Sequence, residues 1–242
     1  ALNGTVLNSA STASSTPALP QVNAQGTCGY GTFNSASSQY VQRADNNLLD
    51  LQGSFTIGLW VKPRTLPASG LMSILSKDEN YEFHLNPSGT INWWWQTTAG
   101  ATNEFNSTTA LPVGQWSHVL IRYAPGEQRI YVNGVLMREQ AMSPQIGRDV
   151  GGPLIIGQTS EDGGNLAGFE GAVDELRLWS QARSGAEIAD TYQSRLTGAE
   201  AGLILYLPLD SFGSDAATPD RSATGASARV RLASPRPCSC TL

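Results

Sequence analysis

The chain has 242 residues, of which 40% are hydrophobic and 14% are charged, and its formal net charge is −5. This acidic balance excludes nucleic acid and anionic membrane surfaces as partners, because both bind basic surfaces. No run of about 18 apolar residues is present, so we expect no insertion into a membrane.

The domain organisation follows from local composition. Residues 1–26 are rich in Ser, Thr and Ala and contain no aromatic residue, which predicts a linker or an extended arm. The 25 glycines and 13 prolines of the chain indicate many short strands joined by tight turns. We therefore predict one large β domain over residues 27–234, followed by a cysteine-containing tail at residues 235–242.

Residues 55–61 alternate between two faces, as expected of a strand with one face on a core. Trp60 lies on the second face, where we expect it to pack against other side chains, and Pro63 ends the strand. The core face carries Phe55, Ile57, Leu59 and Val61.

A hairpin with unusual aromatic content comes next. Residues 81–85 alternate as a strand, and the sequence Asn-Pro-Ser-Gly at 86–89 predicts a turn. The following strand contains Trp93, Trp94 and Trp95, which cannot all point into one core. Exposed indole rings beside Asn and Gln suit the apolar face and hydroxyl rim of a sugar, so these three tryptophans are candidate carbohydrate contacts, with packing in the sandwich as the alternative.

Residues 116–121 form another alternating strand, and Asn133-Gly134 is a strong signal for a hairpin turn. His84 and His118 are the only histidines of the chain, and neither lies in a triad-like phrase. We interpret both as structural.

Residues 168–192, GFEGAVDELRLWSQARSGAEIADTY, read as a glycine turn, a strand, a connector and a helix. In the strand, Asp174 lies on the parity of Leu176 and Leu178, and a carboxylate at the edge of a core is costly unless it is paired or binds a cation. Ser184 and Glu187 have the spacing of a capping box, which predicts one short helix near residues 184–196.

This stretch closely resembles the closing signature of laminin G-like domains of the concanavalin A-like superfamily. The resemblance extends to SFTIGLWVKP (54–63), GQWSHVLIRY (114–123), QRIYVNGVLM (128–137) and PLIIG (153–157), which follow the order of the family. It implies an all-β fold, a two-sheet antiparallel jelly-roll sandwich.

The resemblance also implies a structural Ca²⁺ held by Asp174 together with backbone carbonyl groups. Asp220 is the second candidate ligand, because a hard cation takes carboxylate and carbonyl oxygens from converging loops. The phrase CGYGTFNSASSQYV (28–41) and the strands around the tryptophans are similar to the laminin G-like domain of bacterial surface proteins associated with mannose-sensitive haemagglutinin (MSHA) type IV pili. This implies an extracellular or cell-surface location, a role in adhesion and a place in a larger surface protein.

The cysteines flank the predicted domain. A bridge from Cys28 to Cys238 or Cys240 would join its two ends, as is common outside the cytoplasm, and one of the three thiols is left over. The alternative is three unrelated thiols in a reducing compartment. The absence of a signal-peptide segment agrees with either a cytosolic protein or a mature or excised fragment.

No catalytic motif stands out. Glycoside hydrolysis requires two carboxylates beside the scissile bond, and no phrase in the sequence places such a pair on one strand. Nucleophile elbows, phosphate loops and zinc spacings are also absent from the sequence. We therefore expect a non-catalytic carbohydrate-binding adhesin domain, with a structural or protein-docking domain as the alternative and a hydrolase of the same fold as the least supported reading.

Overall fold

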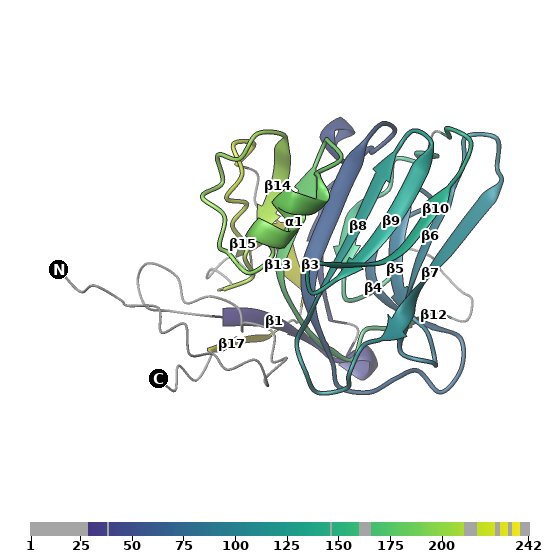
Figure 1. Ribbon diagram of the computed structural model, residues 1–242. Helices are drawn as coiled ribbons and strands as arrows, with labels where there is room; N and C mark the ends of the chain where they lie inside the picture. The colour runs from purple at the N-terminus through teal and green to yellow at the C-terminus, as the bar shows by residue number, and fades with distance from the viewer. Residues whose placement is uncertain are drawn as a thin grey trace, which may run out of the picture.

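The computed structural model describes residues 29–37, 39–145, 147–159, 166–210, 217–225, 228–231 and 234–237. In these residues the chain forms two β-sheets packed against each other (Figure 1), and nearly all neighbouring strands run antiparallel. The predicted two-sheet antiparallel jelly-roll sandwich is confirmed.

The first sheet has the strand order β10-β9-β8-β3-β13-β1-β17, with β14 paired to β13. Its strands are β1 (Gly29–Phe33), β3 (Phe55–Pro63), β8 (Ser117–Ala124), β9 (Glu127–Val132), β10 (Val135–Ala141), β13 (Gly171–Trp179), β14 (Leu203–Leu207) and β17 (Ser234–Pro237).

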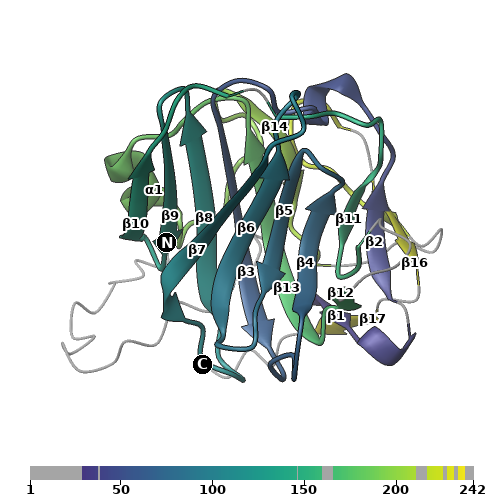
Figure 2. The ribbon, with the colours of Figure 1, turned by 90° about the vertical axis from the view of Figure 1, so that its right-hand side faces the viewer.

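The second sheet has the order β15-β16-β2-β11-β4-β5-β6-β7, and β12 pairs with β4 in parallel. Figure 2 looks onto this sheet, with β4, β5, β6 and β7 side by side. Its strands are β2 (Tyr40–Arg43), β4 (Leu71–Lys77), β5 (Tyr81–Leu85), β6 (Thr90–Gln96), β7 (Thr102–Ala110), β11 (Leu154–Ile156), β12 (Leu166–Gly168), β15 (Ala217–Thr218) and β16 (Ala228–Arg231).

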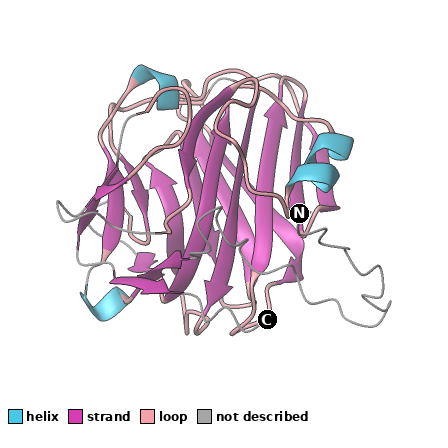
Figure 3. Ribbon diagram, turned by 90° about the vertical axis from the view of Figure 1, so that its left-hand side faces the viewer, coloured by secondary structure: helices cyan, strands magenta, loops and turns pink. Residues whose placement is uncertain are grey.

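Helix α1 (Gly185–Thr191) lies on the outer face of the first sheet, and Figure 3 shows it from that side as the larger coil at the right. Its Ile188 packs against Leu120 and Tyr131 of the sheet. The predicted capping box is present, with Ser184 and Glu187 bonded to each other's backbone N–H groups. The helix ends at Thr191, five residues before the predicted limit of 196. The residues that follow it are held against the sheet by polar contacts described below. Two short 3₁₀ turns complete the helical structure of the described residues, η1 (Ser35–Ser37) and η2 (Asn47–Leu49).

The main core lies between the sheets and collects the inward side chains of each strand. The predicted core face of β3 is confirmed, and Trp60 packs in a separate cluster with Trp116 and Ala172 on the outer face. The predicted turns are present as well. Asn133 and Gly134 both have positive φ, of 51° and 75°, as a two-residue hairpin turn requires.

Asp174 was expected on the same face of the strand as Leu176 and Leu178. This expectation is wrong, because β13 contains a β-bulge. Its pairing with β3 shifts register between Asp174 and Arg177, and Glu175 has a positive φ of 54°. Val173, Leu176 and Leu178 face the core, whereas Asp174 pairs with Trp60 and lies on the outer face. One extra residue in the strand thus moves the carboxylate out of the central core.

Several predictions fall outside the described residues. These are the linker at residues 1–26 and the bridge from Cys28 to Cys238 or Cys240. In the part of the chain that the structure describes, no helix is long and apolar enough to cross a membrane.

Candidate functional site

Strand β6 divides its tryptophans between two faces. Trp93 and Trp95 are 0% and 3% exposed and stack in the core, with 6.3 Å between their ring centroids. Trp94 points to the outer face of the second sheet and is half-buried. The prediction that one core cannot hold all three is confirmed, and Trp94 alone of the three candidate carbohydrate contacts has an appreciable exposed surface.

Cross-strand pairing surrounds Trp94 with polar side chains, which we call the Trp94 face. The face comes from three neighbouring strands, β5, β6 and β7, whose outward residues align in two rows. The first row is Glu82, Trp94 and Glu104, and the second row is His84, Asn92 and Asn106.

A hydrogen-bond network forms the buried floor of the Trp94 face. The Asn92 amide nitrogen donates to Glu104 at 2.7 Å and to Asn106 at 2.9 Å, so its oxygen faces Nδ1 of His84 at 3.1 Å. His84 Nε2 lies 3.1 Å from the Glu82 carboxylate. Glu82, His84 and Asn92 are at most 2% exposed, and because each is held by its neighbours the floor is rigid.

The exposed part of the face has the groups that bind a polyol. Glu104 is exposed and Asn106 is half-buried, and both stand beside the indole of Trp94 on the adjacent strand. An indole can pack on the apolar face of a sugar, while carboxylate and amide oxygens accept hydrogen bonds from hydroxyl groups. Glu82 and Glu104 flank Trp94, but Glu82 is 1% exposed and bonded to His84, so the two do not form an accessible pair for glycoside hydrolysis.

Asp174, the predicted calcium ligand, is fully buried on the outer face of the first sheet. Neither of its carboxylate oxygens has a hydrogen-bond partner among the described residues. Burial raises the pKa of Asp174 well above its usual value of 3.8, and the charges of Glu175 and Asp210 raise it further. Arg195 and the nearby backbone N–H of Glu175, which is too poorly aligned for a full hydrogen bond, lower it. A buried carboxylate without a donor is costly, which is the condition that a bound cation would relieve.

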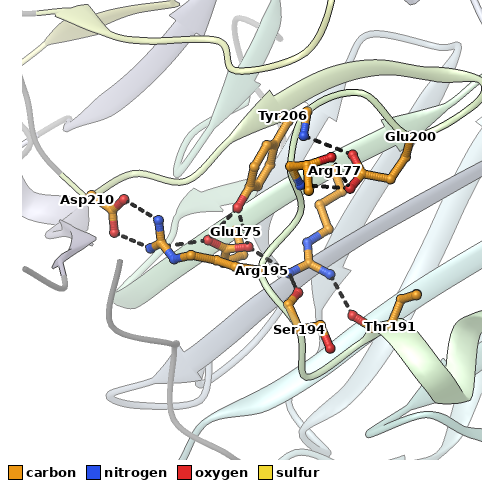
Figure 4. A network of polar contacts seen from close by, with 10 residues as sticks. Glu175, Arg177, Thr191, Ser194, Arg195, Glu200, Tyr206 and Asp210 are labelled. Atoms are coloured by element: carbon orange, nitrogen blue, oxygen red, sulfur yellow. Dashed lines mark hydrogen bonds and ion pairs between the residues drawn. The ribbon is translucent and has the colours of Figure 1, made fainter. Parts of the chain in front are cut away.

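Next to Asp174, two arginines tie the chain after α1 to the sheet (Figure 4). Arg177 donates to Glu175 and to the carbonyl groups of Thr191 and Ser194, at 2.6, 3.1 and 2.6 Å. Arg195 binds both oxygens of Asp210, and its guanidinium also lies 3.4 Å from Glu175. The hydrogen bonds of Arg177 to Thr191 and Ser194 and the ion pairs of Arg195 hold residues 191–195 against the sheet, at the point where α1 ends.

Asp220, the second predicted ligand, has a different role. Its carboxylate accepts hydrogen bonds from the N–H groups of Tyr206 and Ser222 and from the hydroxyl of Thr224, at 3.0, 2.8 and 2.7 Å. Those bonds fix its own loop against β14 and use the oxygens that a cation would need. In the described residues no group of three acidic, His or Cys side chains surrounds one point, so a cation at Asp174 would depend on carbonyl oxygens.

His118 is buried beside Asp174's neighbour Trp60. Its ring lies 5.4 Å from Trp60 and 5.6 Å from Tyr192, and neither ring nitrogen has a partner among the described residues. Burial lowers the pKa of His118 well below 6.5, and the charge of Arg177 lowers it further. The interpretation of His118 as structural agrees with this packing, whereas His84 belongs to the floor of the Trp94 face.

The two packed antiparallel sheets place the chain among jelly-roll β-sandwiches. It belongs to the concanavalin A-like lectin/glucanases superfamily, because the Laminin_G_3 family model matches residues 35–189, more than half of the chain. Comparison with curated proteins finds no match.

Three solved structures with the same fold come from different organisms. A candidate carbohydrate-binding protein from Bacteroides ovatus is 20% identical with a TM-score of 0.70, and the alignment covers 88% of this chain and 60% of that one. The CBM40 of the Ruminococcus gnavus IT-sialidase, solved with α2,3-sialyllactose, is 14% identical with a TM-score of 0.55, covering 67% and 95%. A SAP-like pentraxin from Limulus polyphemus is 19% identical with a TM-score of 0.50, covering 67% and 80%. This chain thus spans 60% of the length of the Bacteroides protein.

Proposed function

We propose that the chain is a non-catalytic carbohydrate-binding domain whose Trp94 face contacts the sugar. The observation that carries this proposal is the half-buried indole of Trp94, flanked by the exposed Glu104 on a buried, hydrogen-bonded floor. Because Asn92 bonds to Glu104 and Asn106, the polar groups are oriented before a ligand arrives, which lowers the entropy cost of binding.

The superfamily and its relatives support this reading. The family is named for lectins and glucanases, the Bacteroides protein is described as a candidate for carbohydrate binding, and the Ruminococcus domain was solved with a sialylated trisaccharide. Binding without hydrolysis is favoured because Glu82 is committed to His84 and leaves Glu104 as the accessible acid.

A glycan array followed by isothermal titration calorimetry tests the proposal. The wild type should bind at least one glycan class, and Trp94→Ala should weaken binding about 5- to 30-fold, since losing one aromatic contact costs about 1–2 kcal/mol. Val135→Ala is the matched control, because Val135 is 58% exposed on β10 of the other sheet.

The outcomes separate the three classes of function. Selective binding that Trp94→Ala loses, with an unchanged melting temperature, supports a carbohydrate site. If the domain binds no glycan on the array, the carbohydrate-binding proposal is refuted and a structural or protein-docking domain is favoured. Release of smaller sugars from a bound oligosaccharide would instead show a hydrolase.

We also propose a structural Ca²⁺ at Asp174, with backbone carbonyl groups as the remaining ligands. The support is the buried carboxylate whose two oxygens lack a donor among the described residues. Calcium at 100 times its dissociation constant should stabilise the domain by about 2.7 kcal/mol.

Asp174→Asn tests this site, because it keeps the shape of the side chain and removes its charge. We expect calcium to raise the melting temperature of the wild type but not of this variant. Asp220→Asn serves as the control and should retain the calcium response, since Asp220 bonds to its own loop. An equal response of Asp174→Asn and wild type would exclude Asp174 as a ligand.

Finally, we propose that the domain acts in adhesion at the cell surface, as part of a larger, pilus-associated surface protein. The sequence resemblance to domains of MSHA-type pilus-associated proteins motivates this role. Beads coated with the domain should bind cells or glycoconjugates that carry the array-positive glycan, and beads coated with Trp94→Ala should not. Equal binding of cells by the two kinds of bead would contradict a role of the Trp94 face in adhesion.

A further inference from the structure

A hollow of about 260 Å³ lies on the outer face of the first sheet, away from the Trp94 face. Its floor is a row across three strands, in which Ala172 of β13 pairs with Lys62 of β3 and Thr32 of β1. The small side chain of Ala172 between two longer ones leaves the space open. The volume corresponds to about nine water molecules, which is the scale of one sugar ring and not of an oligosaccharide.

The charge that lines this hollow is positive. Lys62 is half-buried and has no ion pair or hydrogen bond among the described residues. Arg64 also lines the hollow, but its guanidinium is paired with Glu170. None of the residues described as lining it is acidic, although the chain as a whole carries a net charge of −5.

The other lysine of the chain shows how unusual Lys62 is. Lys77 is 1% exposed at its side chain and lies 3.0 Å from Asp45 and 2.7 Å from Asp50. A structural lysine in this fold is thus surrounded by carboxylates. Lys62 has no such partner among the described residues and lines a space of ligand size, so its charge is available to an incoming anion.

One wall of the hollow is a fixed aromatic ring. Tyr30 packs edge-on against Trp116, with 5.4 Å between ring centroids and 78° between ring planes. Trp116 belongs to a cluster with Trp60 and Ala172, which anchors it to the sheet. Tyr30 is therefore oriented before binding and offers an aromatic surface beside the free ammonium group.

We propose that this hollow is a second ligand site, which binds a carboxylate-bearing monosaccharide. Lys62 binds the carboxylate, the sugar ring packs against Tyr30, and Arg64 at the rim adds positive potential. A single free ammonium group matches the single charge of a carboxylate, whereas a phosphate dianion calls for more donors. The site is independent of the Trp94 face, since it comes from the other sheet.

Calorimetric titration with sodium glucuronate tests the site, with glucose as the neutral counterpart and inorganic phosphate as the alternative anion. The wild type should bind glucuronate in preference to both. Lys62→Gln should weaken binding by about tenfold or more, because it removes a charge-assisted hydrogen bond. Ala172→Leu should weaken it as well, by filling the floor, while Trp94→Ala should bind glucuronate as the wild type does.

A second measurement reports on Lys62 directly. The chain has two lysines, so peptide mass spectrometry can follow the acetylation of Lys62, while the buried Lys77 should stay unmodified as long as the protein remains folded. Glucuronate should slow the acetylation of Lys62 several-fold, and glucose should not. The proposal is overturned if the folded wild type does not bind glucuronate, if Lys62→Gln binds it equally well, if phosphate binds more tightly, or if Trp94→Ala loses it. The last result would place the ligand on the Trp94 face.

Discussion

His118 gives the most quantitative test of the packing on the outer face of the first sheet. Its side chain is buried between Trp60 and Tyr192, and the nearby charged group that acts on it is Arg177. Burial and that positive charge lower its pKa well below 6.5, so the folded protein disfavours protonation of His118. We consider the substitution His118→Phe, which keeps an aromatic ring and cannot take up a proton.

The size of the effect follows from proton linkage. The unfolded chain binds a proton at His118 with a pKa of about 6.5, whereas the folded chain does not. Because the folded pKa is depressed, the stabilisation is present above pH 6.5 and is lost as the pH falls. Between pH 7 and pH 5 this residue alone should reduce the free energy of unfolding by at most about 2 kcal/mol, the limit for a folded state that binds no proton there.

Urea unfolding of the wild type and His118→Phe at pH 7 and pH 5 measures this loss. Other groups, His84 included, are common to both proteins and cancel in the difference between them. The wild type should lose up to about 2 kcal/mol more than the variant between the two pH values. An equal loss in the two proteins would show that His118 is protonated or exposed in the folded state, and would refute the packing described for α1.

Two further substitutions test the same layer by urea unfolding at pH 7. Tyr206→Phe removes a buried hydroxyl that bonds both oxygens of Glu175, at 3.0 and 2.9 Å, and should cost about 1–3 kcal/mol; a loss within error of zero would contradict the network in Figure 4. Gly134→Ala places a Cβ 2.6 Å from the ring of Tyr192 at a positive φ and should cost more than Gly100→Ala, whose φ is also positive but whose Cβ meets nothing within 4 Å. Equal costs would show that the Tyr192 ring moves freely.

Strands, turns and the helix cap were predictable from the sequence because each depends on residues that are close together along the chain. Alternation in β3 placed its core face correctly, and the Asn133-Gly134 dipeptide located a hairpin whose two residues have positive φ. The capping box of α1 was likewise readable from Ser184 and Glu187. Each of these features depends on residues within a few positions of one another.

The bulge at Glu175 shows where such reasoning stops. A period of two assigns Asp174 to the face of Leu176, but one extra residue in β13 reverses that assignment. Glutamate has no special preference for a positive φ, so the sequence gives no local sign of the bulge. It becomes understandable only with the contacts of Glu175 to Arg195 and to the hydroxyl of Tyr206, which folding brings from segments 20 and 31 residues away.

The Trp94 face was only partly predictable for a related reason. Alternation separated Trp94 from Trp93 and Trp95 but did not tell which face is exposed. Glu104 and Asn106 lie on β7, whose sequence TNEFNSTTA is mostly polar and was not predicted as a strand. Their place beside Trp94 depends on the register between β6 and β7. Register is set by the packing of Phe105 against the core, a contact between strands and not a property of either one.

Both proposed sites use the outward positions of strands whose inward positions build the core. Trp93 and Trp95 stabilise the sandwich while Trp94 faces out between them, and in β3 Val61 lies in the core while Lys62 lines the hollow. Similarity of fold at 14–20% identity requires the inward pattern but leaves the outward residues free to change. If the two proposed sites bind their ligands, Trp94→Ala and Lys62→Gln should change binding with little change in stability, because both residues lie at outward positions.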